Sequence, residues 1–177
     1  MLDFIWQACD KLIHEAALPN LVQGIHQLKA ILQQHCLAWK AIALSSLWIP
    51  PGIGFLKGNF GVAIHGNFAV AAAVISNSFG DIILAATQRL SSTDVLMGEA
   101  FAALLTSLLV ASASATHFLL EGDALLVTLA VNQPSTFSSW YFSSYVSNIR
   151  LVLSSFQSWH ASKVSKCANY RAYALAK

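Results

Sequence analysis

The basic residues of this chain are unevenly distributed. Residues 124–177 contain five Lys and Arg and no acid, a formal charge of +5. Residues 1–123 contain five basic residues and all eight acids, a formal charge of −3. Because Lys and Arg bind phosphate groups, a basic C-terminal third could contact a phosphate backbone. Solvated charges on an apolar domain would give the same count. The five residues are Arg150, Lys163, Lys166, Arg171 and Lys177.

Two acids occupy positions where a carboxylate can have a structural or a chemical role. Glu99 falls in the second turn of one predicted helix, and Asp123 directly precedes another. Taken alone, Glu99 is a solvated residue that interacts with the helix dipole, and Asp123 is a helix N-cap. Carboxylates are also the ligands that magnesium favours. The residues by themselves leave both alternatives open, and Glu121 receives no role.

Other site chemistries have little support in the sequence. Cys9, Cys36 and Cys167 are odd in number and widely separated, which indicates thiols in a reducing compartment rather than disulfides or a zinc site. The glycines between residues 52 and 61 lack the strand-to-helix context and the lysine of a phosphate-binding loop. No serine or cysteine nucleophile signature supports acyl-transfer chemistry.

The hydrophobic pattern changes at Pro50-Pro51 and indicates two parts. Apolar residues recur at three- and four-residue steps before the prolines, which predicts amphipathic helices over residues 1–47. The proline pair ends this helical pattern. We expect residues 1–47 to form an N-terminal helical segment and residues 48–177 a separate domain. The helices pack on that domain or, as the alternative, bind a protein partner.

Residues after the prolines predict an α/β fold. Three short β-branched and aromatic runs are followed by alternating helices and strands, which favours a mixed five-stranded sheet with helices on its faces. The predicted strands are Phe55–Ile64, Phe68–Ser76, Asp81–Leu90, His117–Glu121 and Phe156–Val164. The predicted helices are Val95–Ala113, Ala124–Val131, Phe137–Ser154 and Cys167–Lys177.

The composition raises a membrane alternative. Apolar residues make up 56% of the chain and charged residues 10%. Ala100–Leu120 contains no Asp, Glu, Lys or Arg and is long enough to cross a bilayer. Its hydroxyl residues, His117 and its acidic flanks argue against a spanning helix. No signal peptide is apparent, so we expect an intracellular protein of the cytoplasm or nucleus.

Five segments of the chain carry a family pattern. They are Trp48–Asn59, Ser76–Gly80, Gly98–Leu104, Leu119–Ala124 and Lys166–Lys177. The first has the spelling Trp-x-Pro-Pro-x-x-Gly-x-x-Lys-x-Asn. Together these segments resemble the ribonuclease H-like domain of plant retrotransposon-derived proteins. Their order and spacing match that domain across residues 48–177, and the predicted order of strands and helices is the same.

The resemblance implies hydrolysis of RNA–DNA hybrids by two magnesium ions held by four carboxylates. Glu99 and Asp123 occupy two of these catalytic, metal-binding positions. Gly61 stands where the first acid is expected and Tyr173 where the last is expected, so half of the ligands are lost. The resemblance also implies nucleic-acid-binding positions at Lys163, Lys166, Asn169 and Arg171.

We therefore expect a ribonuclease H-like domain that binds an RNA–DNA hybrid or other nucleic acid, with weak or lost hydrolase activity. Magnesium is expected only if activity remains. The alternative is a non-catalytic structural or interaction remnant, and a small membrane protein is the less favoured third possibility.

Overall fold

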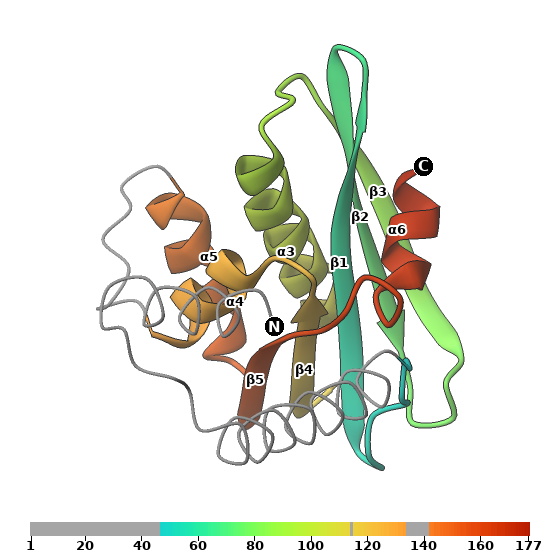
Figure 1. Cartoon of the computed structure of the whole chain (residues 1–177). Coiled ribbons are helices and arrows are strands. Elements are labelled where there is room, and N and C mark those ends of the chain that lie inside the picture. Colours follow the sequence, from blue (N-terminus) through green and yellow to red (C-terminus); the bar gives the residue numbers. More distant parts are fainter. Residues whose placement is uncertain (1–46, 114, 134–141) are drawn as a thin grey trace, which may run out of the picture. The chain divides into compact units, whose positions relative to one another are not determined.

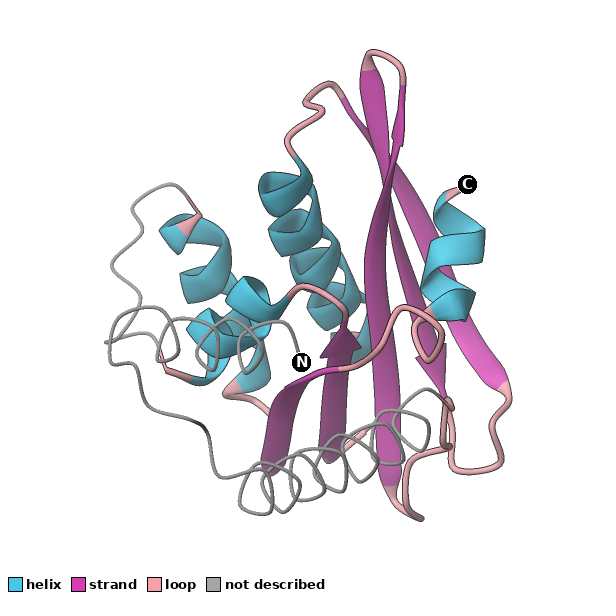
Figure 2. Cartoon of the chain, viewed as in Figure 1, coloured by secondary structure: helices cyan, strands magenta, loops and turns pink. Residues whose placement is uncertain are grey.

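The computed structural model describes residues 47–113, 115–133 and 142–177, which belong to one compact unit, Ser45–Lys177. A five-stranded sheet in the order β3-β2-β1-β4-β5 forms its centre (Figures 1 and 2). The strands are β1 (Phe55–His65), β2 (Phe68–Ser76), β3 (Ile82–Leu90), β4 (His117–Gly122) and β5 (Ser158–Lys163). The helices are α3 (Val95–Ala111), α4 (Leu125–Asn132), α5 (Ser143–Leu153) and α6 (Tyr170–Ala176).

The sheet is mixed, as the sequence predicted. β1, β2 and β3 form an antiparallel meander, whereas β4 runs parallel to β1 and β5 runs parallel to β4. The β1–β2 turn contains Gly66 at a φ of +55°, a conformation that residues with a Cβ rarely adopt. The parallel pairings place the carboxyl ends of β1, β4 and β5 toward one edge of the sheet.

The predicted order of strands and helices is confirmed, and the described boundaries differ from the prediction by at most three residues. β5 begins at Ser158 instead of Phe156, because the Phe156 backbone N–H donates to the Leu153 carbonyl over 3.1 Å in the turn that ends α5. α6 begins at Tyr170, since the residues before it form turns. The predicted start of α5 at Phe137 lies outside the described residues, as do residues 1–46 of the predicted N-terminal helical segment.

Helices α3 and α6 pack on opposite faces of β1 and β2 (Figure 1). Side chains alternate between the two faces of a strand. On the α3 face, a Cβ added to Gly58 would lie 2.5 Å from Thr106 Cγ2, so the missing side chain lets the helix approach closely. On the α6 face, Ala63 clusters with Ala72 and Ala176. Small residues therefore bring both helices close to β1.

The apolar stretch Ala100–Leu120 is divided between two elements. α3 ends at Ala111 and β4 begins at His117, and both contribute to the hydrophobic core. The membrane alternative rested on this stretch forming one helix. Within the described parts of the chain, no helix combines the length and the apolar character needed to cross a bilayer.

Candidate nucleic-acid site at the carboxyl end of β4

The predicted site lies where β4 ends while β1 continues. β1 and β4 are paired as far as Asn59 and Glu121, and β1 then extends to His65. Gly61 therefore lies just past the paired region, close to the carboxyl end of β4. Ligands in α/β sheets commonly bind at the carboxyl ends of the strands.

Glu99 on α3 is buried beside this strand end. Glu99 is only 8% exposed, so the alternative of a solvated helix residue is wrong. Burial raises the pKa of Glu99 to about 8, and the charge of Asp123 raises it as well. A hydrogen bond from the Val62 backbone and the charge of Lys166 act in the opposite direction. Its Oε2 atom is buried without a hydrogen-bond partner.

Asp123 accepts a hydrogen bond from Asn169, a residue near the start of α6. Asn169 Nδ2 donates to Asp123 Oδ1 over 2.9 Å and to the Phe60 carbonyl over 2.7 Å. The N-cap alternative for Asp123 is wrong, because Ala124 is the N-cap of α4 and no side chain caps that helix. Asp123 therefore lies in the site, held by the helix on the opposite side of the sheet from α3.

Gly61 borders the same amide. A Cβ added to Gly61 would lie 3.4 Å from Asn169 Nδ2 and 3.6 Å from the Cβ of Ala172. Gly61 and Asp123 both lie next to the Asn169 amide. Glu99 lies close enough to Asp123 for the two charges to interact. Tyr173, the fourth position, lies one turn along α6 from Asn169, and its ring contacts are with two lysines.

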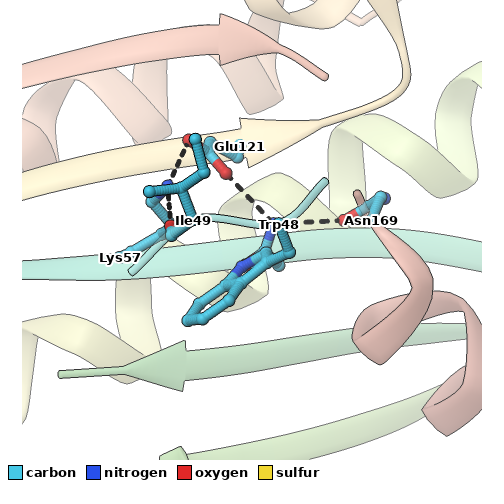
Figure 3. A network of polar contacts seen from close by, with 6 residues as sticks. Trp48, Ile49, Lys57, Glu121 and Asn169 are labelled. Carbon is cyan, nitrogen blue, oxygen red and sulfur yellow. Dashed lines mark hydrogen bonds and ion pairs between the residues drawn. The ribbon is translucent and has the colours of Figure 1, made fainter. Parts of the chain in front are cut away.

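A second polar network lies beside the first and was missed by sequence reasoning. Lys57 and Glu121, which are 6% and 9% exposed, form an ion pair of 2.7 Å (Figure 3). Asn59 lies between this pair and the site, with its Nδ2 atom 3.5 Å from Glu121 Oε2 and 3.4 Å from Asn169 Oδ1. Because Asn59 and Glu121 are register partners, a parallel β1–β4 pairing assumed in advance could have revealed this contact.

The same network holds the segment that enters β1. Trp48 Nε1 donates to Asn59 Oδ1 over 2.9 Å, and Lys57 Nζ donates to the Ile49 carbonyl over 2.8 Å (Figure 3). Arg171 on α6 lies over the Trp48 ring at 3.9 Å. The Trp-x-Pro-Pro segment therefore contacts both β1 and α6.

The residues predicted to bind nucleic acid differ in their accessibility. Lys163 and Lys166 are exposed, and Lys163 is the register partner of Gly122 at the carboxyl end of β4. Asn169 is 1% exposed, and its amide nitrogen donates to Asp123 and to the Phe60 carbonyl. Arg171 stacks on Trp48 and donates to the Gly80 carbonyl over 2.9 Å. Asn169 and Arg171 thus position other elements of the site.

The residues at the strand end do not fit a pair of magnesium ions. Two metals need several oxygen ligands that converge on two cations. Of the four positions that the resemblance assigns to acids, Glu99 and Asp123 carry carboxylates and Gly61 and Tyr173 do not, and Asn169 donates an N–H toward Asp123. In the part of the chain that the structure describes, no three His, Cys, Asp or Glu side chains group around a possible ion.

Comparison with solved structures identifies the fold. Ribonuclease H1 from Halobacterium salinarum is 22% identical, with a TM-score of 0.63 over 69% of this chain and 94% of that protein. The N-terminal ribonuclease H domain of a Mycobacterium tuberculosis protein is 15% identical, with a TM-score of 0.64 over 69% of this chain and 90% of that one. The ribonuclease H1 named LC11, solved with an RNA/DNA hybrid, is 12% identical, with a TM-score of 0.58 over 68% and 91%.

These likenesses establish a ribonuclease H-like fold. A search of curated proteins finds no match. The model of the family described as reverse transcriptase-like matches residues 61–177, which include Glu99, Asp123 and the whole of α3, β4 and α6. The chain therefore belongs to the reverse transcriptase-like family.

Proposed function

We propose that this domain derives from a plant retrotransposon, binds nucleic acid, and has little or no ribonuclease H activity. The observation that carries the proposal is the missing side chain at Gly61, which borders the Asn169 amide that donates to Asp123. The family resemblance expects four converging carboxylates at this place. Two of them remain, Glu99 and Asp123, and Asp123 accepts a hydrogen bond from the Asn169 amide. Hydrolysis by two metals requires oxygen ligands on both ions, and this site lacks them.

Binding of nucleic acid is supported by the charge of the last third of the chain. Lys163 and Lys166 are exposed near the strand end, and residues 124–177 contain no Asp or Glu. Asn169 and Arg171 act indirectly, because they hold Asp123 and Trp48 in place. An RNA–DNA hybrid is the ligand that the family resemblance implies, and its phosphates would bind the two exposed lysines.

A hybrid-cleavage assay with magnesium tests the loss of activity. We expect no cleavage above background from the unmodified protein. The double variant Gly61→Asp, Tyr173→Asp restores two carboxylates, and the Gly61 site accepts a Cβ at ordinary contact distances. We expect this variant to gain magnesium-dependent cleavage. The matched control is Gly61→Asn, Tyr173→Asn, which adds side chains of similar size without charge.

Two results would contradict the proposal. Robust cleavage by the unmodified protein would show that the remaining groups suffice for hydrolysis. The absence of salt-dependent binding to an RNA–DNA hybrid would remove the nucleic-acid function, since neutralised phosphates release counterions and make binding depend on salt.

A further inference from the structure

Two exposed lysines share the ring of Tyr173. Lys166 Nζ and Lys177 Nζ each lie 4.5 Å from the centroid of this ring. The two ammonium groups are therefore separated by no more than twice that distance. Both lysines are exposed, and Tyr173 is partly exposed, so the cluster is open to a ligand.

The neutral ring keeps the two positive charges available. A tyrosine ring holds ammonium groups through its face and does not neutralise them. A carboxylate in its place would pair with one lysine. Because the lysines already lie on the ring, less side-chain freedom is lost when an anion binds.

The cluster lies in the basic part of the chain, next to the candidate site. Lys166 is close enough to Glu99 to affect its pKa, so the cluster borders the carboxyl pair. Residues 124–177, which include β5 and α6, contain no acid. A ligand that approaches along α6 meets lysines and tyrosines.

Tyr170 adds a second aromatic group to this surface. It is 66% exposed and precedes Tyr173 by three residues on α6, so the two side chains occupy neighbouring positions on the helix. Exposed aromatic rings stack on the unpaired bases of single-stranded nucleic acid, whereas the bases of a duplex are already stacked.

We propose that Lys166, Tyr173 and Lys177 bind the phosphates of single-stranded nucleic acid without magnesium, with Tyr170 stacking on a base. This inference rests on the proposed nucleic-acid function and names its ligand class. The position that the family resemblance assigns to a metal-binding acid thus serves, in this chain, to bind an anion.

The test is binding of a short fluorescein-labelled oligothymidylate to the full chain, followed by fluorescence anisotropy in EDTA at several salt concentrations. We expect Lys166→Gln, Lys177→Gln to lower the affinity and to make the slope of log K against log salt shallower by about 0.7 per lysine. The matched control is Arg89→Gln. Arg89 is an exposed residue of β3, and its guanidinium group lies 4.0 Å from the centroid of the Phe68 ring. Binding by Arg89→Gln should equal that of the unmodified protein.

Substitutions of the two tyrosines separate charge from stacking. Tyr173→Phe keeps the ring and should retain binding. Tyr173→Asp places a carboxylate beside the lysines and should reduce the salt slope by about 0.7, as if one lysine were removed. Tyr170→Ala should lower the affinity at least about fivefold and leave the salt slope unchanged, because stacking releases no counterions.

The outcomes separate this inference from the proposed function. Binding of an RNA–DNA hybrid without binding of oligothymidylate overturns the single-strand cluster and leaves the function standing. Oligothymidylate binding that is unaffected by the lysine substitutions also overturns the single-strand cluster and leaves the proposed function standing. If the unmodified protein binds neither ligand, both fail. Robust hybrid cleavage together with lysine-dependent oligothymidylate binding rejects the proposed inactivity and supports the cluster.

Discussion

The side-chain amide of Asn169 donates to Asp123 Oδ1 over 2.9 Å and thereby joins the start of α6 to the end of β4. The same amide nitrogen donates to the Phe60 carbonyl on β1 over 2.7 Å, and the amide oxygen lies 3.4 Å from Asn59 Nδ2. One buried side chain thus links three elements that are far apart in sequence. This linkage makes Asn169 important for stability as well as for the site.

We predict that Asn169→Ala destabilises the domain by about 2 to 4 kcal/mol, because buried polar groups of Phe60 and Asn59 and the partly buried carboxylate of Asp123 lose their partner. Urea denaturation followed by circular dichroism measures the change. Tyr170→Ala is the control, since its side chain is exposed and surface substitutions usually change stability by less than about 0.5 kcal/mol. Equal stabilities for the two variants would show that the amide contributes little.

The buried carboxyl of Glu99 predicts a stability that depends on pH. The pKa of Glu99 is about 8 in the folded protein, against 4.5 as its ordinary value. The folded state therefore binds more protons than the unfolded state between these values, and stability falls as the pH rises through this window. The upper limit of the loss is about 5 kcal/mol above pH 8.

Urea denaturation between pH 6 and pH 9 in EDTA measures this loss. Glu99→Gln keeps the size of the side chain and cannot ionise, so its stability should vary much less over the same range. A parallel pH dependence in the unmodified protein and in Glu99→Gln would assign the effect to another group.

Replacing both Lys57 and Glu121 should destabilise the domain less than replacing one of them. Both side chains are buried, and a single buried charge without its partner is costly. We predict that Glu121→Gln alone destabilises the domain by about 3 to 5 kcal/mol. The double variant Lys57→Met, Glu121→Leu should recover much of this loss.

A double-mutant cycle in urea, completed with Lys57→Met and Glu121→Leu alone, measures the coupling of the ion pair. Additive effects of these two substitutions would contradict the predicted coupling. Because Lys57 also donates to the Ile49 carbonyl, Lys57→Met should in addition loosen the entering segment.

The sequence predicted local features better than it predicted burial. The change of hydrophobic period at Pro50-Pro51 and the turn residues around Gly66 located the strands within a few residues, because these signals are local. The motif order placed Glu99 and Asp123 in one site. Glu121 received no role, since its burial depends on the parallel pairing of β1 with β4, which joins residues 62 positions apart.

Exposure of the basic residues was equally hard to foresee. Arg171 and Lys166 are similar in charge and close in sequence, yet Arg171 lies over Trp48 and Lys166 is exposed. Their difference follows from the position of the Trp-x-Pro-Pro segment against α6. A charge count cannot distinguish a cation that stacks on a neighbouring tryptophan from one that is available to a ligand.

Magnesium should distinguish the unmodified site from one with four carboxylates. A ligand that binds only the folded state raises its stability in proportion to the logarithm of the ligand concentration. We predict no change in the Tm of the unmodified protein on adding magnesium at concentrations that saturate ribonuclease H-like sites. Gly61→Asp, Tyr173→Asp should be less stable than the unmodified protein in EDTA, because Gly61→Asp adds a buried carboxylate close to Asp123. The same variant should regain stability with magnesium, whereas Gly61→Asn, Tyr173→Asn should not respond. A magnesium-dependent rise in the Tm of the unmodified protein would mean that Glu99 and Asp123 hold an ion despite the Asn169 amide.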